Sequence, residues 1–139
     1  MTRPSYSDRC IRKASILIGE VLTDYSLDHI YKTIVGFWEI VELLLRAIIY
    51  MKNKTTYEKP RKLINEYAKI TKVTKGALAS INTLYELRKK TVHKPLILTR
   101  KNVEKARKAF CIAIKELIKE IPKEQIWGLE RIKGLCQKI

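Results

Sequence analysis

The sequence predicts an all-α protein, namely an antiparallel, up-down four-helix bundle with an extra short helix between the second and third long helices and a short C-terminal helical tail. Glycine and proline are few, 5 and 4 of 139 residues, whereas Ile, Leu, Lys, Glu and Ala are abundant. This composition is typical of helices with short connections. We expect one domain over residues 1–139, with a core at about 8–121 and a C-terminal extension over 122–139.

The first two helices are predicted by apolar residues that recur every three or four positions. The first is expected over about residues 8–24, where Ser7 or Asp8 can cap its start. The second is expected to begin near residues 26–28 and to end near Met51. Its apolar seam has coiled-coil spacing, formed by Ile34, Phe37, Val41, Leu44, Ile48 and Met51. Because Trp38, Leu45 and Ile49 widen this seam, we expect the helix in the middle of the bundle or also at a subunit interface.

The remaining helices are delimited by prolines and threonines. A short helix is expected over about residues 57–71, with Pro60 in its first turn. A third long helix should run from residue 75 to about 93, capped by Thr74, with a buried face formed by Leu78, Ile81, Leu84, Tyr85 and Val92. It should end before Pro95, because the residue that precedes a proline disfavours helical geometry. The last long helix is expected over about residues 99–121, and the tail that follows has weaker periodicity.

Positive charge is concentrated in one part of the chain. Residues 1–50 carry six basic and six acidic side chains, so the whole net charge of +15 lies in residues 51–139. Such asymmetry favours a polyanionic partner, with nucleic acid before an anionic membrane surface. A lysine-rich solvated surface explains the composition equally well.

The cysteines and the apolar stretches bear on location. Cys10, Cys111 and Cys136 are odd in number, far apart and without C-x-x-C spacing, so we expect them to be reduced. The most apolar stretch, residues 40–51, is interrupted by charges and is too short to cross a bilayer. These features predict a cytoplasmic protein with no membrane partner.

Arg88 and His93 are the residues of greatest chemical interest. An arginine can bind a phosphate with two hydrogen bonds, and a histidine can transfer a proton near neutral pH. On a helical wheel Arg88 lies about 20° from Ile81, so it projects from the apolar stripe and must find an anion, a partner chain or an open groove. His93 lies about 140° from Arg88, so in one chain the two flank a groove. The alternative is a snorkelling arginine beside a capping histidine.

Four elements of the chain follow one another in a characteristic order. Glu42 and Arg46 form an acidic-x3-basic element, and the short helix begins with Lys59-Pro60-Arg61-Lys62-Leu63-Ile64. The next helix ends in Arg88-x4-His93, and a capped, Ala-rich helix closes the set. With these elements, residues 8–121 resemble the HEPN family (higher eukaryotes and prokaryotes nucleotide-binding domain), many members of which are RNases and toxins of prokaryotic defence systems.

The resemblance implies a homodimer in which two copies of Arg88 and His93 form one composite catalytic site. It implies RNA cleavage without a metal or cofactor, giving 2′,3′-cyclic phosphate ends. His93 would act as general base or acid, and Arg88 would hold the scissile phosphate. Lys89, Lys90, Lys94 and Arg100 would contact the RNA backbone, and Glu42 and Arg46 would be supporting polar residues. A nucleotidyltransferase antitoxin is the implied partner if the protein is the toxin of such a pair.

A second interpretation belongs to a different class. The same bundle can be a catalytically inactive binding or adaptor module that holds nucleic acid or docks on a nucleotidyltransferase. Salt-sensitive binding that leaves RNA intact would distinguish it from the nuclease. A basic architectural DNA binder is a weaker third interpretation, because no groove-reading motif is present.

Overall fold

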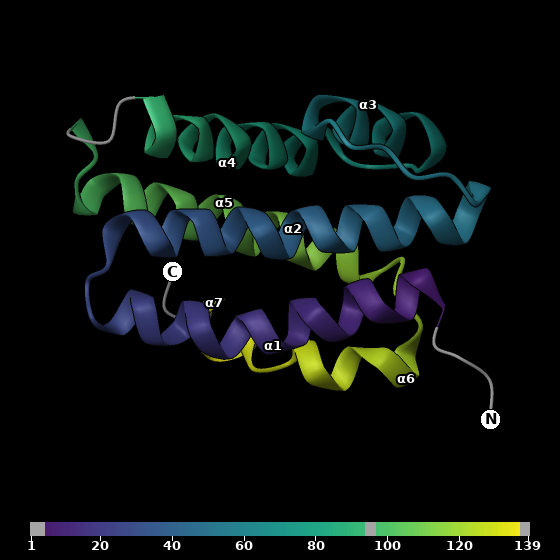
Figure 1. Cartoon of the computed structure of the whole chain (residues 1–139), viewed down its shortest axis with the longest axis horizontal. Coiled ribbons are helices and arrows are strands. Elements are labelled where there is room, and N and C mark those ends of the chain that lie inside the picture. The colour runs from purple at the N-terminus through teal and green to yellow at the C-terminus, as the bar shows by residue number, and fades with distance from the viewer. Residues whose placement is uncertain (1–4, 94–96, 137–139) are drawn as a thin grey trace.

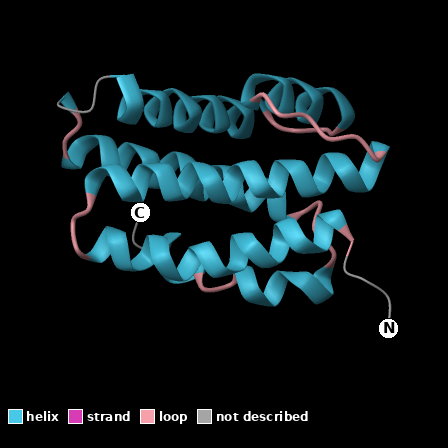
Figure 2. Ribbon diagram, in the orientation of Figure 1, coloured by secondary structure: helices cyan, strands magenta, loops and turns pink. Residues whose placement is uncertain are grey.

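The computed structural model describes residues 5–93 and 97–136, and within these ranges the protein is helical and contains no strand (Figure 2). The all-α prediction is therefore confirmed. The helices, in chain order, are α1 (Tyr6–Ser26), α2 (Ile30–Asn53), α3 (Pro60–Ile70), α4 (Lys75–His93), α5 (Arg100–Ile118), α6 (Lys123–Ile126), the 3-10 helix η2 (Trp127–Leu129) and α7 (Ile132–Cys136).

Helix α2 occupies the centre of the protein. It contacts α1, α3, α4 and α5, and in Figure 1 it lies between α1 and α4 with α5 behind it. Its residues 40–51 are all buried or half-buried, as its wide apolar seam requires. Phe37 of α2 stacks on Phe110 of α5 with ring centroids 4.6 Å apart, and neither ring is accessible to solvent. The helix was expected either centrally or at a subunit interface, and its central position is now evident.

A glycine allows α1 to approach α2 closely. A Cβ placed on Gly36 would lie 2.9 Å from Cγ2 of Val21 in α1, and Val21 is fully packed in the core. Carbon atoms cannot approach so closely without a shift of one helix. The absence of a side chain at this position therefore sets the separation of α1 and α2, which form the groove described below.

Several helix ends differ from the sequence-based prediction, and hydrogen bonds account for two of these differences. Helix α1 is capped by Ser5, whose Oγ accepts from the Asp8 N–H (3.1 Å) while the Asp8 side chain accepts from the Ser5 N–H (3.2 Å). The predicted cap Ser7 is instead buried, and its hydroxyl donates to the Ala47 carbonyl. Helix α5 ends at Ile118, three residues before the expected Ile121, because the last N–H groups donate to carbonyls three residues earlier and tighten the turn before Pro122.

The C-terminal tail belongs to the same core as the long helices. Leu129, Ile132 and Leu135 are buried in that core, and the tail contacts α1 through η2 and α5 through α7. A disulfide joins Cys111 of α5 to Cys136 of α7. The expectation that all three cysteines are reduced is therefore wrong for this pair, which the fold brings together across 25 residues of sequence. Cys10 is free and buried.

Within the described ranges, none of the helices combines the length and the apolar character needed to cross a membrane.

Candidate functional site

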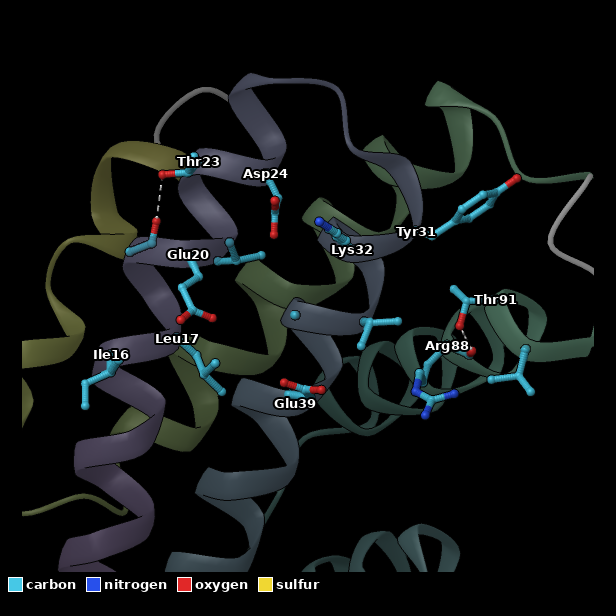
Figure 3. Close-up of a pocket in the computed structure, with 15 residues that line it drawn as sticks. Ile16, Leu17, Glu20, Thr23, Asp24, Tyr31, Lys32, Glu39, Arg88 and Thr91 are labelled. Atoms are coloured by element: carbon cyan, nitrogen blue, oxygen red, sulfur yellow. Dashed lines mark hydrogen bonds between the residues drawn. The ribbon is translucent and has the colours of Figure 1, made fainter.

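A groove of about 980 Å³ runs between α1, α2 and α4. Figure 3 shows Ile16, Leu17 and Glu20 of α1 on one side and Arg88 and Thr91 of α4 on the other, with Lys32 and Glu39 of α2 between them. Three carboxylates (Glu20, Asp24 and Glu39) and two cations (Lys32 and Arg88) line it. The groove is therefore mixed in charge, and its lining also includes the apolar side chains of Val21 and Val35.

Arg88 lies at the edge of this groove, and its positive charge is not neutralised by any other described residue. Its side chain is half-buried and also lines a smaller hollow of about 290 Å³ that contains Trp38, Glu39 and Glu42. No other described residue forms a hydrogen bond or ion pair with its guanidinium. A partly desolvated cation without an anion is costly, so this position favours the binding of an external anion.

The lysines beside Arg88 differ in their exposure and in their ion pairs. Lys89 forms an ion pair with Glu86 (3.0 Å between Nζ and Oε1), and its ammonium lies 5.0 Å from the centre of the Tyr85 ring. Arg61 of α3 binds the same Glu86 oxygen at 3.1 Å. The hydrogen bond from Lys89, together with that from Arg61, lowers the pKa of the Glu86 carboxyl from its ordinary value. Lys90 is exposed, and Lys94 lies outside the described residues.

His93 is the last residue of α4 and is exposed. It is not among the residues that line the groove, whereas Arg88, Thr91 and Val92 are. Within one chain the described structure therefore does not assemble Arg88 and His93 into a single cavity. The helical wheel placed the two side chains on either side of a groove, and of the two only Arg88 lines the groove found here.

Glu42 and Arg46 join α2 to the segment that precedes α3. Glu42 Oε2 accepts from the Trp38 indole N–H at 3.0 Å, and its other oxygen lies 3.4 Å from Nη2 of Arg46. Arg46 also donates to the carbonyls of Tyr57 and Glu58. The pair thus fixes the path of the α2–α3 connection, and Glu42 additionally lines the small hollow beside Arg88.

Arg100 does not line the groove. It forms ion pairs with Asp28, in the turn between α1 and α2, and with Glu104. Glu104 also accepts from the Tyr25 hydroxyl (2.7 Å) and from Arg107 (2.9 Å). Desolvation raises the pKa of Glu104, but the hydrogen bonds from Tyr25 and Arg107 and the charges of Arg107 and Arg100 outweigh it and lower the pKa overall. Arg100 is therefore occupied in a network at the start of α5.

Val92 corrects one sequence expectation. It was assigned to the buried face of α4, but its side chain is 60 % exposed, and Leu87 is buried instead. Val92 lies at the groove, where Ile16 (66 % exposed) and Tyr31 (40 % exposed) are also large apolar side chains open to solvent. The apolar edge of α4 therefore continues to the surface and does not end in the core.

The groove residues on α2 were not expected from the sequence. Tyr31, Lys32, Val35, Gly36 and Glu39 recur at helical spacing, and Tyr31, Lys32 and Glu39 are the exposed positions in the first half of this otherwise buried helix. That narrow polar strip was the signal available in the sequence.

The described residues contain no cluster of three or more His, Cys, Asp or Glu side chains that could hold a metal ion. Compared with protein-family models, curated proteins and solved structures, the chain matches none.

Proposed function

We propose that this chain is a HEPN-type ribonuclease that cleaves RNA without a metal, at a composite site formed by Arg88 and His93 of two copies. In this proposal the four long helices α1, α2, α4 and α5 form an antiparallel bundle with α3 inserted. The family assignment rests on the order of the sequence elements described above. The single structural observation that supports the activity is the half-buried guanidinium of Arg88, which has no anion among the described residues.

The contrast with nearby cations strengthens this interpretation. Arg46, Arg61, Lys89 and Arg100 all form ion pairs with carboxylates of the same chain. Arg88 is half-buried beside Glu39 and Glu42 in the small hollow, yet it pairs with neither. A guanidinium kept free in a partly desolvated position is suited to bind a phosphate with two hydrogen bonds.

The chemistry requires one proton to leave and one to arrive. The ribose 2′-hydroxyl attacks the adjacent phosphorus, and the bond from phosphorus to the 5′ oxygen breaks, which leaves a 2′,3′-cyclic phosphate and a 5′-hydroxyl. His93 accepts the proton of the 2′-hydroxyl or returns a proton to the 5′ oxygen. Arg88 neutralises the charge that develops on the phosphate oxygens.

The second copy would dock through the exposed apolar residues at the groove. Ile16, Tyr31 and Val92 lie on the same side of the protein as Arg88. A two-fold axis along this edge would bring together two Arg88 side chains and two C-termini of α4, each of which carries an exposed His93.

Incubation of the purified protein with RNA in excess EDTA tests the proposal. We expect cleavage with cyclic phosphate ends, and a loss of about a hundredfold or more for Arg88→Ala and for His93→Ala. Arg88→Lys should also be impaired, because lysine keeps the charge but loses the bidentate geometry. His29→Ala and Arg9→Ala, which remove an exposed histidine and an exposed arginine elsewhere, should cleave normally.

Equal cleavage by all variants, or cleavage abolished by EDTA, would overturn the proposal. RNA that is bound but left intact by the native protein would instead support the catalytically inactive binding module. Circular dichroism of each variant separates a lost activity from a lost fold.

A further inference from the structure

The solvent-exposed face of α5 carries lysines almost without interruption. From residue 101 to residue 119, every exposed position is a lysine except Ile112. The five lysines, which we name the lysine row, are Lys101, Lys105, Lys108, Lys115 and Lys119. Their spacing of three, four or seven residues places them on one side of the helix, over a length of about 27 Å at 1.5 Å per residue.

The lysine row is not neutralised by the protein itself. Among the described residues, Lys101, Lys105, Lys108 and Lys115 form no hydrogen bond or ion pair, and Lys119 pairs with Glu116 at 3.2 Å. Like charges three or four residues apart destabilise a helix. A surface that keeps such repulsion without interleaved acidic residues is complementary to a partner that carries many negative charges.

The acidic residues of α5, and Glu120 just after its end, are bound to other segments. Glu104 binds Tyr25, Arg100 and Arg107, and Glu120 forms an ion pair with Lys52 of α2 at 3.1 Å. Glu116, besides Lys119, accepts from the Thr74 backbone N–H at the start of α4. All three carboxylates therefore bind other segments, and lysine is the only charged residue at the exposed positions from 101 to 119.

One end of the lysine row is hollowed. Arg100, Lys101, Lys105 and Lys108 surround a depression of about 360 Å³, and the one carboxylate that lines it is Glu104, which is already bound to three partners. This depression is separate from the Arg88 groove, because the described residues that line the groove come from α1, α2 and α4. In Figure 1, α5 lies behind α2.

We propose that the lysine row binds the phosphate backbone of a nucleic acid, on a face of the protein distinct from the Arg88 groove. This proposal does not depend on the proposed ribonuclease activity. Backbone contacts to nucleic acid are made chiefly by lysine and arginine and need no apolar anchor. A protein partner would require an apolar or aromatic centre, and lysine is depleted at such interfaces. Insertion into a lipid surface would require an exposed apolar face, and Ile112 is the only large apolar side chain that α5 exposes.

Fluorescence anisotropy with labelled duplex RNA, duplex DNA and single-stranded RNA of about 20 nucleotides tests the proposal. The variant Lys101→Gln, Lys105→Gln, Lys108→Gln should bind at least about tenfold more weakly than the native protein to one or more of these ligands. Its slope of log affinity against log salt on duplex DNA should fall by about three, because each contacted phosphate contributes about 0.9. Comparison of the three ligands identifies the form of nucleic acid that is preferred.

The matched control removes the same charge from other helices. Lys13→Gln, Lys62→Gln, Lys69→Gln changes three exposed lysines that form no ion pair among the described residues, and it should keep the native affinity within about threefold. RNA cleavage in excess EDTA is measured on the same proteins. A native protein that binds through the lysine row but cleaves no RNA contradicts the proposed function alone, and a native protein that cleaves RNA but whose lysine-row variant loses no affinity contradicts this proposal alone.

Equal weakening by both triple variants would overturn the proposal, because binding would then depend only on net charge. It would also be overturned if the lysine-row variant bound nucleic acid like the native protein. Stronger binding to phosphatidylserine vesicles or to polyglutamate than to any nucleic acid would assign this face to a membrane or to an acidic protein instead.

Discussion

Two faces of this protein present positive charge in different ways. The groove between α1, α2 and α4 combines cations, carboxylates and exposed apolar side chains around the guanidinium of Arg88, which pairs with no other described residue. The outer face of α5 has a lysine at nearly every exposed position and only one exposed apolar residue. The first arrangement suits a shaped partner held at defined points, and the second suits a polymer of repeated charge held in many registers. Net charge alone would not have separated these two faces.

The largest effect is expected for a substitution that tests whether the side of the protein with the groove is an interface between two copies. Val92→Glu introduces a charge at an exposed apolar residue beside Arg88, and a symmetric dimer would contain it twice. We expect dimer affinity to fall by about a hundredfold or more, since each valine would lose its apolar burial, with little change in the free energy of unfolding. Analytical ultracentrifugation measures the first quantity and urea unfolding the second.

Ile112→Glu is the matched change on the outer face of α5, where Ile112 is 49 % exposed. It should leave the oligomeric state unchanged. A monomeric native protein, or equal effects of the two substitutions, would contradict the assignment of the groove face to a dimer.

The next effect concerns the disulfide that joins α5, the helix that carries the lysine row, to the C-terminal tail. The disulfide between Cys111 and Cys136 fastens the tail to α5, and its reduction should lower the free energy of unfolding by about 2–4 kcal/mol. Urea unfolding with and without a reductant measures this change. In denaturant, thiol titration should find only Cys10 before reduction and all three cysteines afterwards. Three thiols in the untreated protein would contradict the pairing.

A similar effect should distinguish the acidic residues of α5 from its lysines. Glu104→Gln leaves the buried Arg107, whose side chain is 7 % exposed, without its carboxylate. We expect a loss of about 2–3 kcal/mol at neutral pH. Because the folded pKa of Glu104 lies below its ordinary value of 4.5, this stabilisation is complete above that pH and is lost as the pH falls through the folded value. The difference between native and variant should therefore shrink in acid.

Glu130→Gln provides the control, because Glu130 is 54 % exposed and its one partner among the described residues is the exposed Lys133, at 3.8 Å. Its stability should change by no more than about 0.5 kcal/mol at any pH. A pH-independent difference for Glu104→Gln would show that the lost contact is not electrostatic.

The smallest expected effect concerns the groove wall. Gly36→Ala should destabilise the protein by about 1 kcal/mol, because the clash with Val21 outweighs the gain in helix propensity. Gly76→Ala on α4 meets no atom within 4 Å and should stabilise the protein by about 0.5–1 kcal/mol. Thermal unfolding compares the two. A stabilised Gly36→Ala variant would mean that α1 and α2 can separate freely.

Much of the fold could be predicted because residues on the buried side of a helix recur every three or four positions, which is visible in the sequence. The seam of α2 and the end of α4 near His93 followed from apolar period and from Pro95, and Arg88 was expected at the edge of the apolar stripe. Val92 was assigned incorrectly because the same spacing fits a core position and a surface edge. Its exposure depends on where α2 and α5 end their contact with α4, which is a tertiary property.

The cysteine pairing shows the limit most clearly. Cys111 and Cys136 meet because the tail turns back along α1 and α5, and no local pattern predicts such a return. The lysine row is the opposite case, since its period was present in the sequence. The sequence did not indicate that Glu104, Glu116 and Glu120 bind other segments, so that among the described residues only Lys119 of the row has a carboxylate partner.

The position of Arg107 has a consequence for cooperative unfolding. Its guanidinium binds Glu104 of α5 and the carbonyl of Leu135 in α7, and it lies 5.8 Å from the Tyr25 ring centre in α1. Three segments distant in the chain thus converge on one buried charge. Detachment of α1 or of the tail would remove one contact of this charge and expose it, so we expect the end of α1, the start of α5 and the tail to open as one unit. In native-state hydrogen exchange, their slowest amides should share a single opening free energy.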